Sequence, residues 1–345
     1  MSILTIKTKL YLGMSTSKIL HQYKNGNVLV TLYADGTKIR EWEGEQEIET
    51  SESTDLKVTN RCSLGDKFSD TGELLARSKT CEFCHEMSNN IGSHGDLNLI
   101  EKIWSTHQEG TELAIGGGNV MEHPDILPFL TRMSVKGFML NITMNTLHMK
   151  PYANTIRELQ ESKCIRGLGI SYRGPQYMDK LPDNVIYDNA VFHLILGLNN
   201  LKDCKAVIDW CKPRHIQPKI LLLGYKQFGN GIGVYNAELQ KEINKWKIYL
   251  PMLMSMGGLT ISFDNLAIKQ IGVQNYMSKE DWQLLYAGND GSHTQYCCAV
   301  TQTFAKTSTS YKKYPLSMVN NTREMMVIIH EEMRQDNIDL QIPQH

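Results

Sequence analysis

Three cysteines, Cys62, Cys81 and Cys84, are the residues whose types and spacing point most directly to chemistry in this sequence. A C-x2-C pair such as Cys81 and Cys84 can turn both sulfurs to one side of a tight turn or of a first helical turn. With Cys62 there are three thiolates, which suits an iron–sulfur cluster with one iron left open, or a zinc ion completed by His85. Cysteine types alone leave both centres open, and incidental buried thiols are a third interpretation.

Cys62 follows a segment with the pattern of a β-strand. The run DLKVT over residues 55–59 alternates polar and apolar side chains, so Cys62 is expected just past a strand end, on a loop that can wrap a cofactor. Residues 66–80 form an insertion before the C-x2-C pair, and its GELLARS stretch is helix-like.

A glycine run forms the second motif, in TELAIGGGNVMEHPDI. Glycines after a buried strand let a ligand approach the backbone, because no Cβ stands in the way. Gly116, Gly117 and Gly118 are therefore expected to border a bound ligand.

Together these motifs resemble the radical S-adenosylmethionine (radical SAM) superfamily, whose usual cysteine spacing is C-x3-C-x2-C with an aromatic residue before the third cysteine. Phe83 stands in that aromatic position, whereas Asp66 stands where the second cysteine normally falls. Expanded first spacings occur in the superfamily, for example among 7-carboxy-7-deazaguanine synthases. With HGD at 94–96 and HPD at 123–125, the chain looks like a set of bacterial and phage radical SAM proteins over roughly residues 25–315.

The resemblance implies a [4Fe-4S] cluster on the three cysteines and S-adenosylmethionine bound to the open iron. An electron from the reduced cluster then cleaves the sulfonium, and the resulting 5′-deoxyadenosyl radical abstracts hydrogen from a substrate. By the same resemblance Phe83 supports the adenine, and the glycine run with Asn119 helps to hold the amino group. Polar residues at later strand ends complete the expected cofactor site: Asn145, Ser171 and Lys226.

Apolar β-like runs alternate with amphipathic helical patterns from residue 55 onward, which is typical of repeated βα units around a parallel sheet. The expected strands are 55–59, 112–116, 138–144, 167–172, 191–198, 219–224 and 259–263. The expected helices are 97–107, 125–134, 153–161, 204–212 and 238–250. This is an α/β pattern that predicts a partial (β/α)6-type TIM barrel, with its chemistry at the carboxyl ends of the strands.

The expected barrel spans residues 51–265 and is flanked by two smaller parts. Residues 1–50 carry an N-terminal β-hairpin, formed by 27–33 and 37–42 and joined through Asp35 and Gly36. Residues 266–345 form an α+β extension expected to cover the barrel. Its elements are a helix at 278–288, a strand at 296–306 and a helix at 322–336.

Composition limits the partners. The 36 Lys and Arg nearly balance the 37 Asp and Glu, so nucleic acid is not favoured as a partner. The nearly apolar run Tyr249–Met256 is too short to span a bilayer, and eight cysteines without a signal peptide favour a reducing cytoplasm. A small molecule, a peptide and a nucleotide all remain open as substrates. The resemblance also implies an electron donor such as flavodoxin or ferredoxin.

Two other classes of protein compete with the radical enzyme. A zinc-stabilised binding or scaffold protein would use Cys62, Cys81, Cys84 and His85, although structural zinc more often stabilises modules that lack a large core. A barrel enzyme without metal would leave the cysteines incidental.

Overall fold

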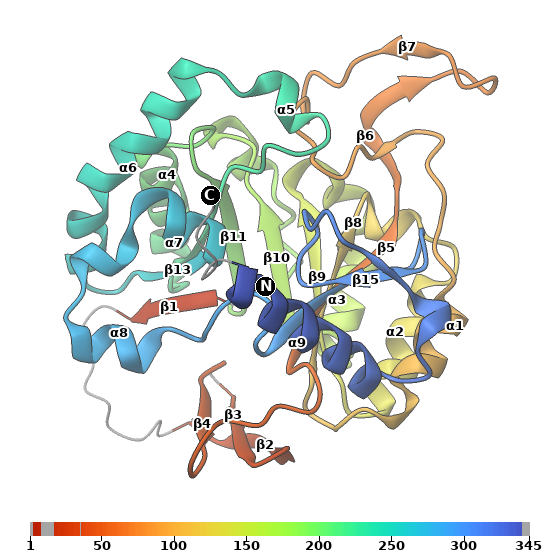
Figure 1. Ribbon diagram of the computed structural model, residues 1–345. Helices are drawn as coiled ribbons and strands as arrows, with labels where there is room; N and C mark the ends of the chain where they lie inside the picture. Colours follow the sequence, from red (N-terminus) through yellow and green to blue (C-terminus); the bar gives the residue numbers. More distant parts are fainter. Residues whose placement is uncertain (1–2, 8–16, 35, 340–345) are drawn as a thin grey trace.

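The computed structural model describes residues 3–7, 17–34 and 36–339 (Figure 1). Asp35, in the predicted hairpin turn, lies outside the described residues. The main sheet has 11 strands in the order β1-β13-β12-β11-β10-β9-β8-β5-β14-β15-β16. Their bounds are β1 (Ile3–Lys7), β5 (Ser53–Thr59), β8 (Glu112–Gly117), β9 (Met139–Asn145), β10 (Gly167–Ser171), β11 (Ala190–Ile195), β12 (Lys219–Leu223), β13 (Thr260–Asp264), β14 (Thr294–Cys298), β15 (Thr303–Ala305) and β16 (Tyr314–Pro315).

All seven strands predicted for the barrel are present, and they pair in parallel from β5 to β13. An additional parallel strand, β14, pairs with β5 on its other side. The predicted count of six βα units is therefore not confirmed, because a strand from the predicted C-terminal extension lengthens the parallel sheet.

Helices cover the outer face of this sheet (Figure 1). In α2 the buried residues Ile126, Phe129, Leu130 and Met133 recur at helical spacing and pack into the core. The helices that follow the strands are α1 (Leu97–Ile103), α2 (Ile126–Val135), α3 (Ala153–Glu161), α4 (Leu201–Cys211), α6 (Ala237–Ser255) and α7 (Asn265–Ile271). The five predicted helices are thus present. None of the helices in the described part combines the length and hydropathy needed to cross a membrane.

The N-terminal part has more structure than the predicted hairpin. The hairpin is formed by β3 (Val28–Tyr33) and β4 (Lys38–Glu41), and β2 (Ile19–Asn25) adds a further antiparallel strand. The small sheet lies below the main sheet in Figure 1. Strand β1 pairs antiparallel with β13 and so belongs to the main sheet.

The segment between β5 and α1 departs most from prediction. Cys62 lies within β6 (Arg61–Phe68), not on a loop, and GELLARS contains β7 (Leu74–Ala76) instead of a helix. The two strands pair in a hairpin that projects at the upper right of Figure 1. All three β7 residues are exposed, so a helix here would have no apolar face to bury, whereas the β6 edge offers backbone partners.

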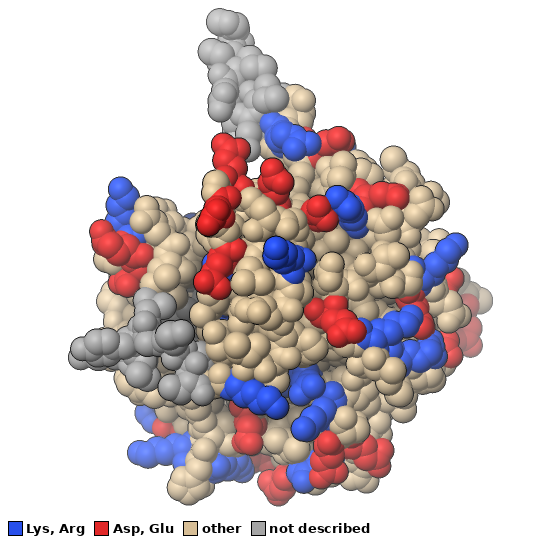
Figure 2. All heavy atoms as spheres, turned by 90° about the horizontal axis from the view of Figure 1, so that it is seen from below, with Lys and Arg blue, Asp and Glu red and all other residues tan. Residues whose placement is uncertain are grey.

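The C-terminal part also differs in detail. The helices α8 (Lys279–Leu285) and α9 (Thr322–Asp339) form, but the predicted strand 296–306 is divided into β14 and β15, joined by a turn. Gln302 in this turn has a φ of 52°, which reverses the chain and ends a continuous strand. Acidic and basic side chains are interspersed over the lower face of the molecule, in keeping with the balanced composition (Figure 2).

Candidate functional site

A cavity of about 3060 Å³ lies on the inner face of the curved sheet. Side chains alternate between the two faces of a strand, so one set packs under the helices and the other faces this cavity. Each parallel strand contributes to the lining, with Lys57 of β5, Gly116 of β8, Asn145 of β9, Ser171 of β10, His193 of β11, Leu223 of β12, Ser262 of β13 and Tyr296 of β14. Asn141, Thr143 and Asn145 alternate along β9, and all three line the cavity.

The three candidate cysteines lie in this same cavity wall. Cys62 is buried in β6, and the backbone amide of Cys84 donates to the Cys81 carbonyl at 3.0 Å, which closes the predicted tight turn. Burial, together with the negative charges of Cys81 and Cys84, raises the pKa of Cys62 to about 11. Asn145 Nδ2 donates to Cys81 Sγ at 3.8 Å. The thiols are thus neighbours that act on one another electrostatically.

Asp66 anchors the segment that carries Cys81. Its carboxylate accepts from Arg77 Nη1 at 2.7 Å and from the Ser78 backbone amide at 2.8 Å. Ser78 Oγ in turn accepts from the Cys81 backbone amide at 2.9 Å. Burial raises the pKa of Asp66, but these partners outweigh it and hold that pKa below its usual value. The residue at the family's second cysteine position therefore fixes the entry into the C-x2-C turn.

The zinc ligand set is not assembled. No three His, Cys, Asp or Glu side chains in the described part of the chain are arranged to hold a metal ion. His85 Nε2 instead lies 3.2 Å from Lys226 Nζ and 3.3 Å from Glu86 Oε1. The structure therefore does not favour the zinc alternative.

An ionic network that was not predicted from the sequence joins the segment after the C-x2-C turn to strands β5 and β14. Lys57 Nζ contacts Glu86 Oε2 at 2.5 Å, Tyr296 Oη donates to Glu86 Oε1 at 3.4 Å, and Lys226 Nζ donates to Ser308 Oγ at 2.9 Å. Burial raises the pKa of Glu86, but His85 and Lys57 hold it far below its usual value. The sequence did contain one sign of this network, because the charged residue Lys57 alternates with the apolar Leu56 and Val58.

The glycine run has two different roles. At Gly116 a Cβ would meet no atom within 4 Å, so the backbone is open there, as predicted for a ligand contact. At Gly117, with a φ of 119°, and at Gly118 a Cβ would lie 2.4 Å from Thr59 O and 2.0 Å from Arg61 O. These two glycines therefore seat the backbone that leads into Cys62.

Asn119 is buried and is not among the residues that line the cavity. Its side chain accepts from the Met121 amide at 3.3 Å and donates to Glu122 Oε1 at 3.0 Å. Glu122 Oε1 also accepts from the Ser63 amide at 3.2 Å, next to Cys62. Asn119 thus stabilises the loop beside the cysteine strand.

The remaining predicted site residues, Phe83, Asn145, Ser171 and Lys226, line the cavity together. Arg173, which was not predicted, lies over the Phe83 ring with its Cζ 4.7 Å from the centroid. His193 of β11 faces the cavity; burial lowers its pKa to about 4, although Asp55 acts in the opposite direction.

No family model matches the chain, and no curated protein matches it. Its fold matches that of SuiB from Streptococcus suis. The structure of SuiB bound to the precursor peptide SuiA has a TM-score of 0.54 and 11% identity, and the match covers 79% of this chain and 64% of SuiB. SuiB bound to S-adenosylmethionine gives 0.54 and 12%, with 79% and 65% covered. A further structure of SuiB gives 0.51 and 11%, again with 79% and 65% covered.

The chain therefore spans less than two thirds of the length of the SuiB chains, and the likeness is one of fold. At 11–12% identity, these matches show a shared fold.

Proposed function

We propose that this protein is a radical SAM enzyme. The observation that carries the proposal is a single cavity wall in which the thiols of Cys62, Cys81 and Cys84 accompany Phe83 and Gly116. That wall belongs to a mostly parallel sheet with the fold of a protein solved with S-adenosylmethionine bound.

The donor set fits a [4Fe-4S] cluster. Three thiols from two segments of the chain can each bind a different iron and leave the fourth open, which requires wider sulfur spacing than a single metal ion does. When bound, such a cluster supplies the electron that cleaves S-adenosylmethionine to a 5′-deoxyadenosyl radical.

The chain's own residues orient the reactants and tune the centre. The Asn145 amide donates to Cys81 Sγ, and hydrogen bonds to cluster sulfurs influence the reduction potential. Phe83 offers a ring face to the adenine, and Gly116 lets the amino-acid part of S-adenosylmethionine approach the backbone. Ser171 and Lys226 line the wall where the ribose and carboxylate need polar partners.

For the substrate we favour a peptide. The cavity volume of about 3060 Å³ exceeds the roughly 300–1,000 Å³ of ordinary small-molecule sites. SuiB, which shares the fold, was solved with its precursor peptide bound. The remaining assignments are a flavodoxin or ferredoxin as electron donor and a reducing cytoplasm that keeps the thiols available.

Anaerobic reconstitution with iron and sulfide, followed by reduction in the presence of S-adenosylmethionine, tests the proposal. We expect 5′-deoxyadenosine to form only with the reconstituted protein. One zinc per chain after expression in iron- and zinc-supplemented medium, with no 5′-deoxyadenosine, would contradict it.

A further inference from the structure

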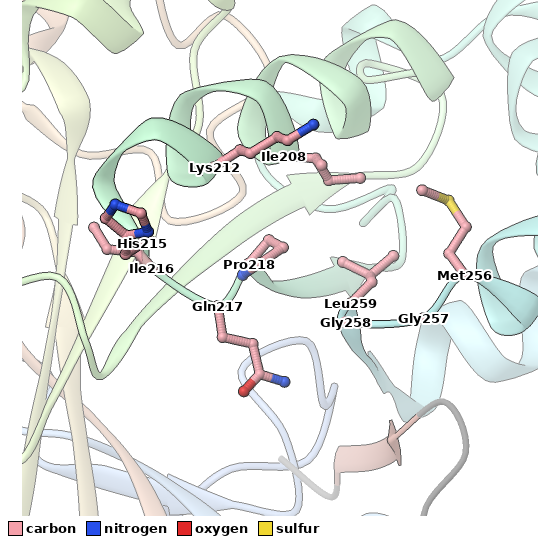
Figure 3. A pocket seen from close by; sticks show the side chains of 10 residues that line it. All are labelled: Ile208, Lys212, His215, Ile216, Gln217, Pro218, Met256, Gly257, Gly258 and Leu259. Atoms are coloured by element: carbon pink, nitrogen blue, oxygen red, sulfur yellow. The ribbon is translucent and has the colours of Figure 1, made fainter.

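A smaller pocket of about 370 Å³ lies between the end of α4, the start of β12 and the segment that joins α6 to β13 (Figure 3). We call it the flank pocket. Its apolar lining consists of Ile208, Ile216, Pro218, Met256 and Leu259. Lys212 and His215 complete one side and are exposed. It thus combines an apolar interior with a basic rim.

The flank pocket adjoins the large cavity. Gln217, Leu259 and the pair Gly257–Gly258 line both hollows. A Cβ on either glycine would meet no atom within 4 Å, so the junction between the hollows is kept open by residues without side chains. Because this junction precedes β12 and β13, it lies at the amino-terminal ends of these strands, whereas the cysteine turn lies at the carboxyl ends of the sheet.

The separation between these ends suits an extended chain. Strand β12 has 5 residues, and at about 3.3 Å per residue it spans roughly 17 Å. An extended peptide has the same rise, so about five or six of its residues would run from the cysteine end of the cavity to the flank pocket.

From this shared lining, and resting on the proposed function, we infer that the flank pocket binds the segment of a peptide substrate that flanks the reacting residue. An apolar side chain of the peptide enters the pocket among Ile208, Met256 and Leu259. An adjacent acidic side chain meets Lys212 at the rim, because the lysine is the fixed positive charge there.

Selection of peptides from a phage-displayed library of random twelve-residue sequences, on the full-length protein reconstituted anaerobically with S-adenosylmethionine, tests this inference. We expect enriched peptides to carry an apolar residue beside Asp or Glu. Lys212→Glu should shift the charge preference to Lys or Arg. The matched control Lys202→Glu, exposed in the first turn of α4, the helix that ends just before Lys212, should leave both the preference and the 5′-deoxyadenosine formed without peptide unchanged.

A second variant fills the junction. Gly257 has open space for a side chain and no positive φ, so Gly257→Phe should keep the wild-type melting temperature and yet weaken binding of the enriched peptides at least tenfold. Unchanged binding by this variant, or an unchanged charge preference in Lys212→Glu, would overturn the inference. So would a wild-type dimer that Gly257→Phe converts to a monomer, because a second copy of the chain would then be the occupant.

Failure of this inference and failure of the proposed function give different results. If the wild-type protein selects such peptides through Lys212 but forms no 5′-deoxyadenosine, the radical reaction is wrong and the peptide groove stands. If 5′-deoxyadenosine forms and no peptide preference emerges, the groove is wrong and the reaction stands.

Discussion

Cys62 is only 8% exposed, because it belongs to strand β6 and points into the cavity wall. If a buried thiol binds the cluster, iron binding should depend on its sulfur atom and not on the volume of its side chain. We therefore expect Cys62→Ser, which keeps the size, to bind severalfold less iron after reconstitution while its circular dichroism stays unchanged. Cys164→Ser is the matched control, since this thiol is equally buried but lies outside the cavity lining. Equal iron binding by both variants would contradict the assignment of Cys62.

Phe83 gives a second test at the residue scale. If its ring supports the adenine, Phe83→Ala removes one aromatic contact of about 0.5–1.5 kcal/mol, so the KM for S-adenosylmethionine should rise up to about tenfold. Tyr311→Ala, which alters a side chain that is 99% exposed, should leave the KM unchanged. The measurement is 5′-deoxyadenosine formation at varied concentrations of S-adenosylmethionine. An unchanged KM in Phe83→Ala would mean that the Phe83 ring contacts Arg173 and does not support the adenine.

Site residues with a local pattern were predictable, and those defined by distant partners were not. Cys81, Cys84 and Phe83 share one short motif and line one cavity. Glu86 becomes part of the site through Lys57, 29 residues earlier, and through Tyr296, 210 residues later. Only the register of the sheet brings these strands together, and sequence spacing does not encode it.

At the scale of elements, Gly118, which directly follows β8, packs against Arg61 at the start of β6. A Cβ there would lie 2.0 Å from the backbone carbonyl of Arg61, so Gly118→Ala must shift the strand that carries Cys62. We expect a loss of about 1–3 kcal/mol in the free energy of unfolding together with reduced iron binding. Gly116→Ala is the control, because its Cβ would meet nothing within 4 Å, and its stability should stay within about 0.5 kcal/mol of wild type. Urea unfolding measures both, and equal stabilities would show that the β6 contact is not tight.

The strands differ in how well their positions can be predicted from the sequence. The seven barrel strands were predictable because buried parallel strands leave runs of Leu, Ile and Val. Strands β6 and β7 were not, because their residues are polar or exposed and their pairing is set by the hairpin turn. The glycine run was recognised, but two of its glycines serve contact between backbones, and that function depends on the position of β6.

At the scale of the whole molecule, Glu52 joins the small N-terminal sheet to the main sheet. Its fully buried carboxylate lies 2.8 Å from Arg40 Nη2 and 3.8 Å from Lys38 Nζ. Burial raises the pKa of Glu52, but Arg40 and Lys38 outweigh it and hold the pKa below 4.5. The pKa of Glu52 is lower in the folded protein than in the unfolded chain. The stability that this carboxylate contributes is therefore complete at pH values above its pKa in the unfolded chain. It is lost as the pH falls through its pKa in the folded protein.

His293, which lies near Glu52, also makes the folded protein less stable in acid. Burial lowers its pKa from 6.5 to about 4, so protons favour the unfolded chain between these values. The free energy of unfolding should therefore fall from pH 6.5 to 4. Glu52→Gln should lose about 2–4 kcal/mol at pH 7 and progressively less below pH 4.5, whereas Glu49→Gln, in an exposed pair with Arg323, should lose under about 1 kcal/mol. A deficit of Glu52→Gln that does not shrink in acid would contradict this role of the charge.

The C-terminal chain was predicted to cover an open barrel, and part of it supplies β14 to the sheet beside β5. A strand that pairs across more than 200 residues leaves no local mark of its partner, so only its β-like composition was readable. Its position places Tyr296 in the lining of the cavity.

Electron paramagnetic resonance of the anaerobically reconstituted, dithionite-reduced protein, with and without S-adenosylmethionine, tests the central claim most directly. We expect about four irons per chain and a reduced-cluster signal that S-adenosylmethionine perturbs, because one iron lacks a protein ligand. A reconstituted protein with no such signal, or a cluster signal that S-adenosylmethionine leaves unchanged, would contradict it.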